Sequence, residues 1–203
     1  MSKRIYISAD YAYEDGDRNV VDQLNTWARD NYHIMDFVDM AKVVSGSVSL
    51  NNPDCRPCDL KKEFNDQINK SSIVVFVVGN KTASRKAGSS CGRAQNGIWC
   101  TPYKNNANGS KFCDRNYNYG YMFNYSSDVN PVNDYSYLRH EFEQAKAKNK
   151  TIVILFNSTR YEYSWLPSYM RGYENCSMPF WDMGWYSNWV PNYSRIKRAL
   201  EYE

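Results

Sequence analysis

The chain has 203 residues, enough for one well-buried domain but short for two. Its formal net charge is +3, without a long run of lysine or arginine, so we expect neither nucleic acid nor an anionic membrane to be captured by charge. No apolar stretch approaches the roughly 20 residues of a membrane span, and residues 1–6 lack the apolar core of a signal peptide, which predicts a cytoplasmic protein.

The N-terminal third predicts two strands and a helix. Residues 3–8 (KRIYIS) form the first strand and lead into an acidic, tyrosine-rich loop. We expect Asp17 to cap a helix from Arg18 to about Asp30, because apolar residues recur there at helical spacing. Residues 33–38 predict a second strand, and a polar loop follows over 43–57.

The middle of the chain predicts a helix, a buried strand and an insertion. Asp59 is expected to cap a helix whose apolar stripe is Leu60, Phe64 and Ile68. The continuous apolar run 73–78 is typical of a central strand buried on both faces. Residues 81–133 show no clear period and predict an insertion with short hairpins around 97–99 and 119–121.

A helix over 134–149 carries Glu141 and turns Leu138, Phe142 and Ala145 to the core. The apolar strand 151–156 follows, and then an aromatic-rich extension, 157–203, with an edge strand at 178–182 and a closing helix at 193–202. Strands that alternate with helices predict an α/β fold with a parallel sheet of about five strands. The carboxyl edge of such a sheet binds ligands.

Six cysteines are not a disulfide framework by default in a reducing compartment. Cys55 and Cys58 have the spacing of half a zinc site. Because no second C-x-x-C and no recognised histidine pattern completes that site, we favour free thiols and predict no metal.

Two segments resemble the Toll/interleukin-1 receptor (TIR) family. Residues 3–8 with Ala9-Asp10-Tyr11 are similar to the family's first strand and loop. Residues 137–142 (YLRHEF), with an aromatic residue four positions before Glu141, resemble a helix of that family. The likeness covers roughly 3–80 and 134–156 and is closest to the Thoeris antiphage-defence TIR-like (ThsB) family. It implies one flavodoxin-like domain over 1–203, with a long insertion before the helix that carries Glu141.

This resemblance also implies an activity. In enzymatic TIR domains the glutamate that corresponds to Glu141 is catalytic, and NAD is a substrate rather than a cofactor. The expected reaction cleaves the nicotinamide–ribose bond and yields a cyclic ADP-ribose-type signal, which a partner effector reads. TIR enzymes often assemble the site across subunits, which suggests a homo-oligomer. Pocket shape decides between hydrolysis and cyclisation, so both stay open.

The expected cleavage of the nicotinamide–ribose bond requires little from the protein beyond one carboxylate. Cleavage passes through an oxocarbenium-like sugar, as in glycoside hydrolysis, and the neutral pyridine leaves without a general acid. A carboxylate in a water-poor site can stabilise the cation. Glu141 has the right type and place; its alternative role is that of a helix N-terminal carboxylate favoured by the helix dipole.

Four further residues are candidate substrate contacts. Tyr137 lies one helical turn before Glu141, where it would stack on a base or pack at the domain edge. Ser8 ends the first strand and Asp10 and Tyr11 follow it, where they would bind the ribose or order the loop. We assign Tyr6 to the core.

Other functions compete with this one. The chain has no G-x-G-x-x-G after its first strand, no phosphate-binding P-loop and no G-x-S-x-G elbow, which disfavours dehydrogenases, P-loop NTPases and serine hydrolases. A non-catalytic TIR-like interaction module would use the insertion and the 43–57 loop for protein contacts. A nucleoside deoxyribosyltransferase-like enzyme would use the glutamate as a nucleophile.

Overall fold

A computed structural model describes residues 3–10, 12, 16–29, 36–39, 56–86, 104–105, 111–112 and 136–200. The main sheet of this part has five parallel strands: β1 (Arg4–Ser8), β2 (Asp36–Asp39), β3 (Ile73–Val78), β6 (Thr151–Phe156) and β7 (Ser177–Pro179). Their order, β2-β1-β3-β6-β7, is that of flavodoxin-like proteins, in which the winding direction changes between β1 and β3. The α/β fold predicted from the sequence is therefore confirmed.

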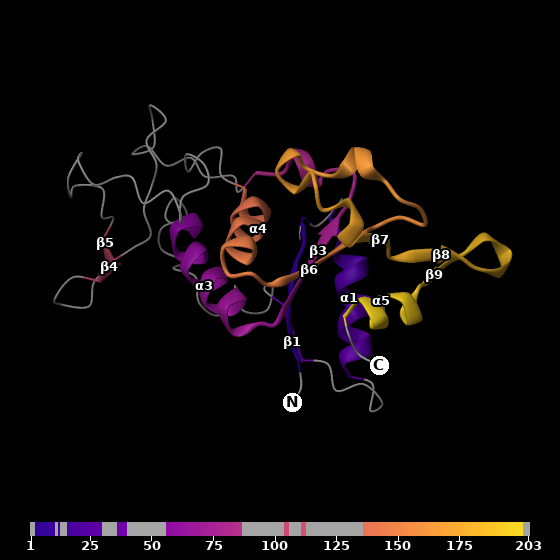
Figure 1. Cartoon of the computed structure of the whole chain (residues 1–203), viewed down its shortest axis with the longest axis horizontal. Helices are drawn as coiled ribbons and strands as arrows, with labels where there is room; N and C mark the ends of the chain where they lie inside the picture. Colours follow the sequence, from indigo (N-terminus) through magenta and orange to yellow (C-terminus); the bar gives the residue numbers. More distant parts are fainter. Residues whose placement is uncertain are drawn as a thin grey trace.

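Helices cover both faces of this sheet (Figure 1). Helices α3 (Arg56–Lys70) and α4 (Tyr137–Ala147) pack on one face, and α1 (Arg18–Ala28) and α5 (Tyr193–Ala199) on the other. All six residues of β3 are buried because β3 is central and has helices on both sides, which explains its unbroken apolar sequence. The predicted stripe Leu60, Phe64 and Ile68 is buried in α3.

Helix α3 begins at Arg56, before the predicted start near Asp59. Asp59 lies inside the helix and is not its cap, and Arg56 and Pro57 belong to the helix rather than to the preceding loop. Proline is compatible with a first helical turn because its missing N–H would have no helical partner there. Strand β2 begins at Asp36; residues 33–35, where the prediction started, lie outside the described part.

The C-terminal extension divides between the sheet and a separate hairpin. The predicted edge strand at 178–182 is correct only in its first part, β7, which pairs with β6. After Phe180 the chain enters β8 (Trp181–Met183), which pairs instead with β9 (Trp189–Pro191). This antiparallel hairpin extends away from the sheet (Figure 1) and exposes Trp185 and Tyr186. The closing helix, α5, ends at Ala199.

Within the predicted insertion, β4 (Lys104–Asn105) and β5 (Lys111–Phe112) form a short antiparallel pair. The hairpins expected around 97–99 and 119–121 lie outside the described residues. Among the helices that the structure describes, none has the length and apolar character to cross a membrane.

Candidate active site

The predicted catalytic residue, Glu141, is held by strand β1. Tyr6 and Ser8 point to the same face of β1 because side chains alternate along a strand. The Tyr6 hydroxyl donates to Glu141 Oε1, and the Ser8 hydroxyl donates to Oε2. Glu141 lies near the start of α4, which Ser136 caps by accepting the Arg139 backbone N–H at 3.3 Å. Each carboxylate oxygen thus meets one hydroxyl donor.

Burial controls the ionisation of Glu141. The residue is 4% exposed, and neither Tyr6 nor Ser8 exposes more than 1%. Burial raises the Glu141 pKa from 4.5 to about 7, because the charged form loses its water, while the hydrogen bonds from Ser8 and Tyr6 oppose this rise. A carboxyl pKa so far above its ordinary value is common for groups that work as acids, bases or electrostatic stabilisers.

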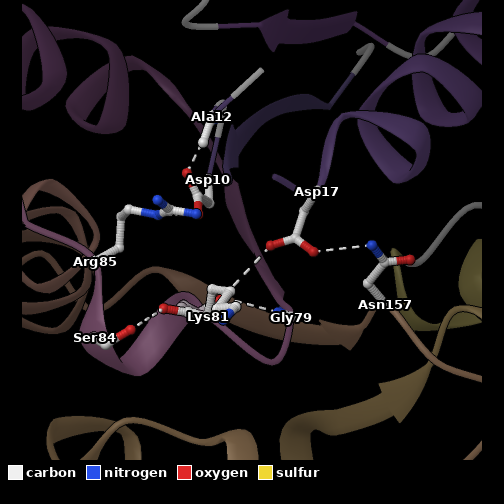
Figure 2. Close-up of polar contacts among 9 residues, drawn as sticks. Asp10, Ala12, Asp17, Gly79, Lys81, Ser84, Arg85 and Asn157 are labelled. Carbon is white, nitrogen blue, oxygen red and sulfur yellow. Dashed lines mark hydrogen bonds and ion pairs between the residues drawn. The ribbon is translucent and has the colours of Figure 1, made fainter. Parts of the chain in front are cut away.

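Asp10 orders the segment after β1 and pairs with an arginine from beyond β3 (Figure 2). Its Oδ1 accepts the Ala12 backbone N–H at 3.0 Å, and its Oδ2 accepts Arg85 Nε at 2.5 Å. Asp10 is buried, whereas 38% of the Arg85 side chain is exposed. Of the two roles expected for Asp10, these contacts are those of loop ordering.

Asp17 is the N-cap residue of helix α1, as predicted, but its carboxylate makes no hydrogen bond to the N–H groups of the first turn. It accepts Asn157 Nδ2 at 2.9 Å and the Thr82 hydroxyl at 3.4 Å, so it joins the segments that follow β1, β3 and β6 (Figure 2). The carboxylate lies so close to Gly79 that a Cβ there would be 2.3 Å from Asp17 Oδ1. Burial raises the pKa of Asp17, since its neutral partners only partly replace water.

Of the remaining predicted site residues, Tyr137 packs between helices and Tyr11 lies outside the described part. Tyr137 packs edge-on against Phe64 of α3, with ring centroids 5.4 Å apart, which matches the packing role considered for it. Tyr11 and Cys55 lie outside the described residues, as does the side chain of Cys58. In the part of the chain that is described, no three His, Cys, Asp or Glu side chains form a group suited to a metal ion.

Two residues of this region were not predicted from the sequence as site residues. Tyr6 was assigned to the core, and its ring is indeed buried there, but its hydroxyl contacts Glu141. The available signal was its i, i+2 spacing to Ser8, which places both hydroxyls on one face. Arg85 lies in the segment assigned to the insertion, and only its position after a central strand could have indicated a role.

The sheet order, and the polar side chains after β1, β3 and β6, define an α/β protein with a TIR-like, flavodoxin-like fold. Residues 6–87 match the family model for the TIR-like domain of the Thoeris protein ThsB, the family that the first strand and the helix with Glu141 resemble in sequence. The match includes Tyr6, Ser8, Asp10 and Arg85 and ends before α4 and Glu141. Comparisons with curated proteins and with solved structures gave no match.

Proposed function

We propose that the protein is an NAD-consuming enzyme that cleaves the nicotinamide–ribose bond with Glu141 as its catalytic carboxylate. The observation that carries the proposal is the buried Glu141 carboxylate, held by two hydroxyl groups from β1 in a TIR-like fold. The released ADP-ribosyl group would close into a cyclic ADP-ribose-type signal for a partner effector.

The environment of Glu141 suits a reaction that develops positive charge. With 4% of the residue exposed, the carboxylate acts through a low effective dielectric, where its attraction to an oxocarbenium-like ribose exceeds that in water. The ionised form is the active one. A cation close to Glu141 lowers its pKa from about 7, so the approach to the transition state itself favours ionisation.

The two hydroxyl donors also suit a substrate that carries hydroxyl groups. Tyr6 and Ser8 satisfy the carboxylate in the absence of substrate. Ribose hydroxyls are donors of the same kind, so a bound sugar would take the place of the Ser8 hydroxyl on Oε2 without leaving this carboxylate oxygen unpaired. Tyr6, whose ring is fixed in the core, would keep Oε1 in position.

The test is incubation of the full chain with NAD, with nicotinamide and nucleotide products separated by chromatography and identified by mass. Glu141→Gln keeps size and removes charge, so we expect nicotinamide release to fall at least a hundredfold. Glu143→Gln is the matched control, because Glu143 lies two residues on, is half-exposed and pairs with Lys146 at 3.3 Å. Equal release by wild type and Glu141→Gln, at high protein concentration and with infected-cell lysate added, would refute the proposal.

A non-catalytic interaction module is the second candidate. The observation that favours it is the exposed aromatic tip of the β8–β9 hairpin, where Trp185 is 90% exposed. Absence of nicotinamide release in every condition would support it. A deoxyribosyltransferase-like activity would instead give base exchange on deoxynucleosides.

A further inference from the structure

The Asp10–Arg85 pair connects β1 and β3 at the place where the winding of the sheet changes direction. Asp10 lies two residues beyond the end of β1, and Arg85 follows the short 3-10 turn η2 (Thr82–Ser84) after β3. Ligands of open α/β sheets bind outside the carboxyl ends of the strands at such a point. The pair therefore occupies the general position of a ligand site, although neither residue is assigned a direct role in catalysis.

Asp10 fixes the arginine in place. Its side chain is 7% exposed, its Oδ1 is held by the Ala12 N–H, and its backbone carbonyl accepts the Asp17 N–H at 2.7 Å. Arg85 Nε is bound to Oδ2 of this anchored carboxylate, while more than a third of the arginine side chain faces solvent. A guanidinium oriented by a carboxylate loses less rotamer freedom when an anion binds, and its planar group of N–H donors matches phosphate oxygens.

The charges around this pair favour an anion. Lys81 and Lys86 belong to the same short segment as Arg85 and are exposed. These two lysines and Arg85 carry three formal positive charges, against two negative charges on the nearby carboxylates of Asp10 and Asp17. The segment after β3 thus has a local excess of positive charge, although the net charge of the chain is only +3.

We infer that Arg85, positioned by Asp10, binds the diphosphate of a dinucleotide substrate. This inference rests on the proposed function, since Ser8 and Glu141 mark the ribose end of the same site. Ser8 and Asp10 are two residues apart, about 6.5 Å for extended chain, which is comparable to the reach from a ribose to its diphosphate. Asp10 is a positioning residue in this arrangement and acts through Arg85.

The test measures binding rather than turnover. ADP-ribose and inorganic pyrophosphate are titrated by calorimetry into the full chain as wild type, Arg85→Ala, Arg85→Lys and Arg198→Ala. We expect Arg85→Ala to weaken ADP-ribose binding roughly tenfold to a hundredfold, and Arg85→Lys to weaken it less, because lysine keeps the charge without the planar donor group. Arg198→Ala, on α5, should bind like wild type. Adenosine, which lacks phosphate, should not distinguish the variants.

Failure of this inference and failure of the proposed function give different results. Wild-type affinity for ADP-ribose in both Arg85 variants, or no ADP-ribose binding by wild type at millimolar concentration, would overturn the inference even if NAD is cleaved. Arg85-dependent binding by a protein that never releases nicotinamide would uphold the diphosphate site and refute only the enzyme. Thermal melts of each variant identify any that fail to fold, and Arg85→Lys then supplies the comparison because it keeps the charge opposite Asp10.

Discussion

The buried Glu141 should make the protein less stable at alkaline pH, and Glu141→Gln should remove this effect. In the unfolded chain the group titrates near its ordinary value of 4.5, whereas burial raises its pKa in the folded state to about 7. Between these values the folded state binds the extra proton, so stability falls as pH rises from 4.5 to 7 and stays low above it. The rise in pKa corresponds to a loss of about 3 kcal/mol above pH 7.

Glutamine at position 141 preserves the local packing without the loss of stability that the buried charge causes above pH 7. Its Oε1 can accept the Tyr6 hydroxyl, and its Nε2 can donate to Ser8 Oγ. Glu141→Gln should therefore match wild type below pH 4.5 and melt roughly 5–10 °C higher at pH 8, given the entropy of unfolding of a chain of this size. Paired thermal melts from pH 4 to pH 9 isolate Glu141, since all other groups titrate in both proteins. A wild type that is as stable as Glu141→Gln at pH 8 would refute the argument.

Two other substitutions follow from the same contacts. Tyr6→Phe removes one donor to the carboxylate, so the Glu141 pKa should rise above about 7 and the acid limb of any NAD cleavage should move to higher pH. Carbon-13 NMR of labelled glutamate measures this pKa, with Glu141→Gln as the assignment control. A pKa that fell or stayed unchanged in Tyr6→Phe would contradict the prediction. Ser136→Ala removes the cap of α4 and should cost about 1 kcal/mol in urea unfolding, whereas Ser136→Thr should retain most of that stability; equal losses in both would argue against capping.

The strands and helices of the core could be predicted from the sequence because their burial requires a local pattern of apolar residues. Strand β3 begins and ends where its apolar run does, and α4 falls within the predicted 134–149. Asp17 occupies the predicted N-cap position of α1 without the expected capping bond, and Asp59 was predicted wrongly as a cap. A carboxylate near a helix start is compatible with capping, but the Asp17 carboxylate binds Asn157, which is distant in the sequence. Pro57 allowed α3 to begin before Asp59.

Only part of the candidate site could be predicted from the sequence. Glu141 was singled out by its motif, yet its hydrogen-bond donors come from β1, far away in the sequence, and no local period links them. Tyr6 fits the sequence pattern of a core residue, so nothing in that pattern indicated a separate role for its hydroxyl group. The Asp10–Arg85 pair likewise depends on which strands the fold places side by side.

The close approach of Asp17 to Gly79 has an evolutionary consequence. A side chain at position 79 would collide with the carboxylate that joins the ends of three strands, so any replacement of Gly79 is damaging while Asp17 is present. Loss of Asp17 would open that space and remove the constraint on Gly79. Among descendants of this chain, Asp17 is therefore expected to change first and Gly79 afterwards. Gly79→Ala should be tolerated better on an Asp17→Ala background than alone.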